Sequence, residues 1–226
     1  MVRFAWWRYL LRLWEGDGAL PVILVLLVVL IFVWPVLITP ANPLDYLRHV
    51  VFTALLLAGA MTAMKYRWLR LVVGVIVGAA LALRWLAVAW PAEVLLAWRE
   101  ASTLLLLALF CVIVATRVYG AGPVTSRRIM GAVAVYLLLG LAWEQAYELL
   151  HMLRPESFAG VDADTGPDAW TYFSFVTLTT VGYGDITPVS PLARSLAIAQ
   201  ALTGQIYLAV MLARLVALQL ADRAAD

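Results

Sequence analysis

Two glycines separated by a single residue stand out in the run Thr180, Val181, Gly182, Tyr183, Gly184. Glycine tolerates backbone dihedral angles that other L-residues reach poorly. A backbone of this kind can present successive carbonyl oxygens to a dehydrated cation, where they replace its water. One chain cannot close a ring of oxygens around an ion. The chemistry available to this run therefore requires identical loops from several chains around one axis.

The stretch 168–188 closely resembles the pore signature of potassium channels, whose filter sequence is TVGYG. The resemblance covers roughly residues 127–220, and it is greatest to small bacterial channels with six spans. It implies a potassium-selective homotetramer with K⁺ ions in the filter and no organic cofactor. The residues that it assigns to K⁺ coordination are Thr180, Val181, Gly182, Tyr183 and Gly184.

The elements that position this run are predicted to lie in a lipid bilayer. The chain is 65% hydrophobic and 13% charged, whereas soluble domains are about 45–50% apolar and about 25% charged. A spanning helix needs about 20 predominantly apolar residues. We predict an all-α membrane protein with six transmembrane helices, a re-entrant pore helix and a filter. The six predicted spans are residues 20–38, 44–64, 68–90, 92–118, 127–151 and 192–220.

The chain divides into four predicted parts. They are an interfacial helix (1–18), a four-helix transmembrane domain (19–118), a linker (119–126) and a pore domain (127–226). Residues 1–18 can also be interpreted as the polar flank of the first span. Because the linker is short and contains glycine and proline, we expect the four-helix domain to pack against the pore domain of its own subunit.

The four-helix domain occupies the position of a voltage sensor, but it has no array of basic residues. A sensor helix carries Arg or Lys at every third position, whereas the fourth predicted span has only Arg99 and Arg117. We therefore expect weak or absent voltage dependence. Arg84 and Glu100 come level in the hairpin around Pro91, so we also expect these two residues to pair.

Several residues are predicted to support the filter. The pore helix is expected to start at Asp168 or Pro167 and to end near Leu178. Tyr172 replaces the tryptophan of many relatives, and its phenol can still donate to Asp185. Glu144 and Glu148 share a helix face and can bond the start of the pore helix or of the inner helix; a cation-attracting surface is the alternative role. The predicted support residues are Asp185, Tyr172, Thr177, Thr179, Glu144 and Glu148.

The last span is predicted to be the inner helix that gates the pore. Gly204 lies where relatives carry a hinge glycine, although a small residue there can also serve close helix packing. An apolar ring below it can close a pore by dewetting. The predicted gate residues are Leu208, Met211, Leu212 and Leu215.

Most Lys and Arg residues fall on the side that holds both ends of the chain, which predicts cytoplasmic termini for a multi-pass protein of the cell membrane. The segment 153–191 is acidic and is expected to face outward. The predicted partners are three further copies of the chain and membrane lipids, with no nucleic acid and no small-molecule substrate. The alternatives to a potassium channel are a non-conducting regulatory or scaffold subunit, a less selective cation channel, and a membrane enzyme or secondary transporter.

Overall fold

The structure is a computed structural model of the chain, and it describes residues 19–37, 50–55, 58–59, 67–90, 93–120, 125–161 and 168–225. Within this part, four helices are long and apolar enough to cross a membrane. They match the first, fourth, fifth and sixth predicted spans. These helices are Ala19–Val36, Val94–Val118, Ser126–Leu153 and Pro191–Arg214.

The other two predicted spans, the second and the third, are not among these four helices. The third forms helix α5 (Arg67–Ala89), but its apolar part, Val73–Ala87, is shorter than the four spans above. The second, 44–64, lies mostly outside the described residues, with helix at 50–55 and 58–59. The predicted interfacial helix at 1–18 lies wholly outside them.

The first span changes its winding partway along. It consists of α2 (Ala19–Val28), a π-helical turn η1 (Val29–Val33) and α3 (Trp34–Leu37). Proline has no N–H to donate, and its ring crowds the carbonyl four residues earlier. The turn just before Pro35 is the one that widens, with the Trp34 N–H donating to the carbonyl of Val29. Single π turns of this kind are a known response to such a break in the helical ladder.

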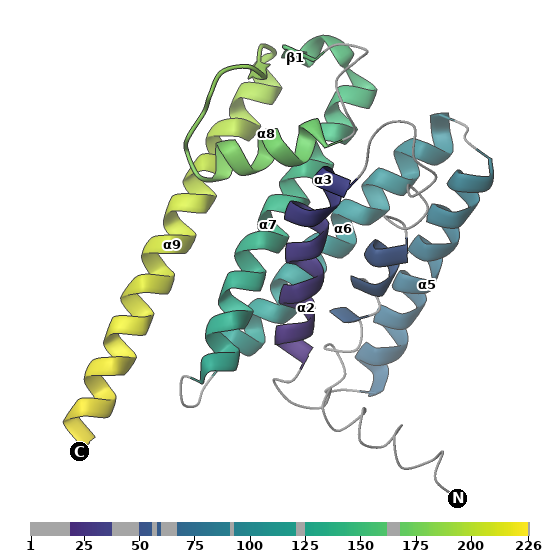
Figure 1. The fold of residues 1–226 in the computed structure, drawn as a ribbon. Helices are drawn as coiled ribbons and strands as arrows, with labels where there is room; N and C mark the ends of the chain where they lie inside the picture. The colour runs from purple at the N-terminus through teal and green to yellow at the C-terminus, as the bar shows by residue number, and fades with distance from the viewer. Residues whose placement is uncertain are drawn as a thin grey trace, which may run out of the picture.

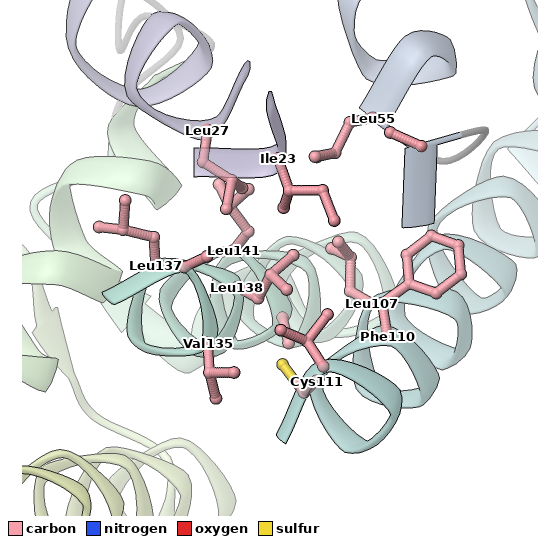
Figure 2. Packing of buried hydrophobic residues seen from close by; sticks show 14 of the residues in the cluster. Ile23, Leu27, Leu55, Leu107, Phe110, Cys111, Val135, Leu137, Leu138 and Leu141 are labelled. Atoms are coloured by element: carbon pink, nitrogen blue, oxygen red, sulfur yellow. The ribbon is translucent and has the colours of Figure 1, made fainter. Parts of the chain in front are cut away.

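Helix α7 (Ser126–Leu153) is the central element of the bundle (Figure 1). It packs against α6 (Glu93–Val118) and α2 on one side and against the short helix α8 on another. Helices α6 and α7 pack together within the chain, and the expected packing of the four-helix domain on its own subunit in an assembly stays a prediction. Figure 2 shows the aliphatic core where α2, α6 and α7 meet, which includes Ile23, Leu27, Leu107, Phe110, Cys111, Leu138 and Leu141.

The chain ends of these helices follow local signals. Thr125 precedes α7 in an extended conformation, and its side chain accepts from the Arg128 N–H, which is the arrangement of an N-cap. The helix therefore starts at Ser126, inside the predicted linker. Helix α5 ends at Ala89 and α6 begins at Glu93, and the two helices pack together as the predicted hairpin requires.

The segment between α7 and the last helix is compact and partly folded back. Helix α8 runs across the long helices, and the chain then returns to the upper end of α9 (Figure 1). Two short strands pair antiparallel, Phe158 with Pro188 and Ala159 with Thr187. The prediction of a helical protein did not include this short pairing. The elements are η2 (Pro155–Ser157), β1 (Phe158–Ala159), α8 (Ala169–Leu178), β2 (Thr187–Pro188) and α9 (Pro191–Ala225).

Candidate functional site

Helix α8 ends at Leu178, as predicted, and two threonines stabilise its end. The Thr179 hydroxyl donates to the carbonyl of Phe175 at 2.7 Å. The carbonyl of Thr177 accepts from the N–H of Thr180 at 3.0 Å. These contacts satisfy groups that a helix C-terminus otherwise leaves without partners. The Thr179 hydroxyl and the backbone carbonyl of Thr177 therefore close the last turn of α8, just before the glycine run.

The backbone of this run alternates in handedness. Thr180, Gly182 and Gly184 have φ angles of 60°, 56° and 83°, whereas Val181 and Tyr183 between them do not have positive φ. In an extended strand successive residues face opposite sides. When left-handed and right-handed residues alternate, successive carbonyl groups can instead face the same side. The pattern explains the two glycines, which adopt positive φ without steric cost.

The N–H groups and carbonyl groups of the run are used differently. The N–H groups of Val181 and Gly182 both donate to the carbonyl of Val176, at 2.9 and 3.3 Å. Within the described part of the chain, the carbonyls of Thr180, Val181, Gly182 and Tyr183 accept no hydrogen bond. The N–H groups of the run are therefore bonded to the end of α8, whereas its carbonyl oxygens have no hydrogen-bond donor in the described part of the chain.

Tyr172 of α8 holds the outer end of the run through two contacts. Its ring stacks on that of Tyr183, with centroids 6.3 Å apart and an interplanar angle of 3°. Its hydroxyl is hydrogen-bonded to the Asp185 carboxylate, which is the contact that the sequence analysis considered. This bond lowers the pKa of Asp185 below its ordinary value and is the main cause that raises the pKa of Tyr172 to about 12.

A turn that was not predicted from the sequence packs against the same end of the run. The carbonyl of Ser157 accepts from the N–H of Val189 at 2.9 Å, next to the paired strands β1 and β2. Gly160 has φ of 82°, and a Cβ at this position would overlap the carbonyl oxygen of Asp185. The turn after α7 thus lies directly against the exit of the glycine run, at a distance that only glycine permits.

The two predicted glutamates of α7 lie beside the start of α8. Glu144 and Glu148 line a cavity of about 70 Å³ together with Asp168 and Thr171, at the start of α8. The two glutamates were expected near the start of the pore helix or of the inner helix. In the structure they lie near the start of α8. Glu144 is buried, with 4% of its surface exposed.

Charged residues from the first helices line the same cavity. Arg84 of α5 and Glu100 of α6, which were predicted to pair, both line it. The ion pair that Glu100 forms, however, is with its neighbour Arg99. The Arg84 guanidinium lies 4.3 Å above the centre of the Phe52 ring, a cation–π distance.

Gly204 allows α9 to approach α8 closely. It is buried in an uninterrupted helix, and a Cβ there would overlap the carbonyl oxygen of Leu178. Of the two roles predicted for this glycine, close packing has a direct contact to support it.

The predicted gate residues separate onto two faces of α9. Leu208 and Leu212 are exposed in the single chain. Met211 instead packs against the main hydrophobic cluster, as Tyr207 one turn earlier does, and its role as a gate residue stays a prediction. Residues four apart share a helix face, which places Met211 with Tyr207 rather than with the two leucines. The side chain of Leu215 lies outside the described part of the structure.

Two glutamines of α9 contact the site and were not predicted. The Gln205 amide donates to the Thr180 hydroxyl at 3.4 Å, and Gln200 is fully buried against α8. A polar residue inside an otherwise apolar span is a signal of function or of a buried partner. Both glutamines carry this signal, because each lies in the apolar spanning part of α9.

Comparison with known families agrees with the geometry. A family model for ion channels matches residues 160–219, which include α8, the glycine run and the whole spanning part of α9. No curated protein and no solved structure matches the chain. The C-terminal part of the chain is therefore similar to an ion channel domain. Together with the four long apolar helices, this similarity indicates a membrane protein.

Proposed function

We propose that the chain is one subunit of a homotetrameric potassium channel and that residues 180–184 form its selectivity filter. The observation that carries the proposal is the alternating backbone of this run, whose N–H groups are bonded to α8 and whose carbonyls accept no hydrogen bond in the described part of the chain. Four such loops around an axis would offer rings of carbonyl oxygens that replace the hydration shell of K⁺.

The surroundings of the run favour a cation. The carbonyl groups at the C-terminus of a helix carry partial negative charge, and α8 ends immediately before Thr180. The Thr180 hydroxyl supplies one more oxygen at the inner end, and the Asp185 carboxylate supplies negative charge at the outer end. In this arrangement Thr180, Val181, Gly182 and Tyr183 coordinate K⁺, and no organic cofactor takes part.

The exposed surfaces of the single chain support assembly with identical copies. Only 11% of the spanning part of α9 is buried, compared with 61% for α7. Val181 and Tyr183 are 54% and 72% exposed in the single chain. In the proposed tetramer these two side chains pack behind the filter and are covered by neighbouring subunits. In the proposed tetramer α9 is the inner helix, and its leucines at 208 and 212 face the conduction path.

The proposal extends to orientation and control. Both termini are cytoplasmic, and the turn at 154–160 faces outward with the outer end of the filter. Helix α6 carries Arg99 and Arg117 with an apolar run between them, so a change in membrane potential moves few charges. We therefore propose that opening depends weakly or not at all on voltage.

The test is the reversal potential of the purified protein in planar bilayers under opposed K⁺ and Na⁺ gradients. We expect reversal near the K⁺ equilibrium potential, block by Ba²⁺, and no K⁺ current from Gly182→Ala. Gly74→Ala is the matched control, because a Cβ at Gly74 meets no atom within 4 Å.

Other results would point to the alternatives. Reversal near zero would mean a less selective cation channel. An absence of current from verified tetramers, over a range of lipids and pH, would favour a regulatory or scaffold subunit.

A further inference from the structure

A chain of hydrogen bonds joins α7, α8 and α9 behind the glycine run. The Tyr147 hydroxyl donates to Gln200 Oε1 at 2.6 Å. Gln200 Nε2 donates to the hydroxyl and the carbonyl of Ser174, at 2.8 and 2.9 Å. The Ser174 hydroxyl donates to the carbonyl of Gly140 at 2.7 Å. The chain thus starts on α7, passes through α9 and α8, and returns to α7; we call it the polar circuit.

The polar circuit is buried and directional. Tyr147, Ser174 and Gln200 each have 0% of their surface exposed. A backbone carbonyl only accepts hydrogen bonds, so the amide nitrogen of Gln200 must face Ser174 and its oxygen must face Tyr147. Every bond in the circuit therefore has one possible direction. Buried polar groups that lose a partner cost about 1–3 kcal/mol each, so the circuit favours a single arrangement of the three helices.

The polar circuit lies two residues from the anchor of the glycine run. Ser174 precedes Val176, whose carbonyl accepts from the N–H groups of Val181 and Gly182. One turn beyond Gln200 on α9, Gly204 lies against the carbonyl of Leu178. Helix α9 therefore contacts α8 at Ser174 and at Leu178. These two positions lie on either side of Val176, whose carbonyl accepts from the run.

We infer that Gln200 is a positioning residue for the filter: it sets the rotation and height of α9 against α8, and through Val176 it sets the backbone of residues 180–182. A displacement of α9 at the outer level of the membrane would thus reach the filter without any movement of its lower end. The inference rests on the proposed function in treating the run as a filter.

Amide hydrogen exchange tests the positioning role without reference to ion selectivity. In purified tetramers, we expect Gln200→Leu to speed exchange of the Val181 and Gly182 N–H groups at least tenfold. Tyr207→Phe is the matched control, since it removes another α9-to-α7 bond, from the Tyr207 hydroxyl to the carbonyl of Ala132 at 2.6 Å, that does not touch α8. The same variants are compared for K⁺/Na⁺ permeability ratio and thermal stability.

The outcomes separate the two proposals. If Gln200→Leu speeds filter exchange and lowers the permeability ratio while Tyr207→Phe only lowers stability, both proposals stand. If exchange responds but the wild-type protein is not K⁺-selective, the positioning role stands and the proposed function fails. Equal effects of both variants on exchange would overturn the positioning role. Should Gln200→Leu not assemble, Tyr147→Phe removes one donor from the circuit and is expected to give a smaller change in the same direction.

Discussion

The two halves of the described chain are held together by different contacts. In the front half, residues 19–120, the helices meet α7 through aliphatic side chains such as Leu27 and Leu107 (Figure 2). In the pore half, residues 125–225, hydrogen bonds cross between helices, as in the polar circuit and the bond from Tyr207 to Ala132. Helix α7 belongs to both. Its contacts with α2 and α6 are mainly aliphatic, except at the charged cavity that Glu144 and Glu148 line, and hydrogen bonds link it to α8 and α9.

The difference separates a tolerant region from a strict one. Aliphatic packing accepts many substitutions of similar volume before the fold is lost. Directional hydrogen bonds and glycine contacts fix one register, because each donor or close approach has a single partner. We therefore expect the pore half to tolerate fewer substitutions than the front half. Three substitutions test this contrast.

The largest effect is expected from Gly160→Ala. The new Cβ would overlap the carbonyl oxygen of Asp185, and the residue would have to keep a φ of 82°; left-handed backbone strain alone costs on the order of 1–3 kcal/mol. We expect loss of current and a clear drop in thermal stability. Gly74→Ala in the front half is the control, and it should raise stability by up to about 1 kcal/mol, as expected for a helix-interior glycine. Normal conduction by Gly160→Ala would show that the close approach of residue 160 to the Asp185 carbonyl is not needed for conduction.

Gly204→Ala is expected to have an intermediate effect. The Cβ would push α9 away from the Leu178 carbonyl, and overpacking of this kind costs about 1–3 kcal/mol. We expect weaker tetramers and a reduced single-channel conductance, measured by thermal dissociation and in bilayers. A hinge role predicts a different result, namely normal conductance and stability with a lower open probability.

The smallest effect is expected from Tyr172→Phe, and it depends on pH. The Tyr172 hydroxyl lowers the pKa of Asp185, so this bond stabilises the outer end above the ordinary carboxyl pKa and is lost as pH falls through the lowered value. Without the hydroxyl, Asp185 should protonate at a higher pH, closer to 3.8. The midpoint of current loss on external acidification should shift upward by the same amount. An unchanged midpoint would show that the bond does not act on Asp185.

Much of the pore half could be predicted from the sequence because its signals are local. The glycine run, the end of α8 at Leu178 and the spans of α7 and α9 each depend on residues close together in the chain. The contact between Tyr172 and Asp185 was also within reach, since both residues belong to one short motif.

The rest depends on residues far apart. Tyr147 and Gln200 are 53 positions apart, and nothing in their local patterns links them. The turn at Gly160 depends on the later position of Asp185, and the pairing of β1 with β2 involves only two residues on each strand. The packing of Met211 against the main hydrophobic cluster was not predicted, because hydrophobicity alone does not tell which apolar side of α9 faces α7.

Thr180 adds a consequence for sequence variation. It is the one non-glycine residue with positive φ in the described part of the chain, and a β-branched residue is poorly suited to that conformation. Glycine would relieve the strain, so folding alone would select glycine here. The hydroxyl is what glycine cannot supply. A variant with glycine at this position would therefore be easier to fold, but it would lose the hydroxyl that accepts from the Gln205 amide and, in the proposed channel, one oxygen ligand of the ion.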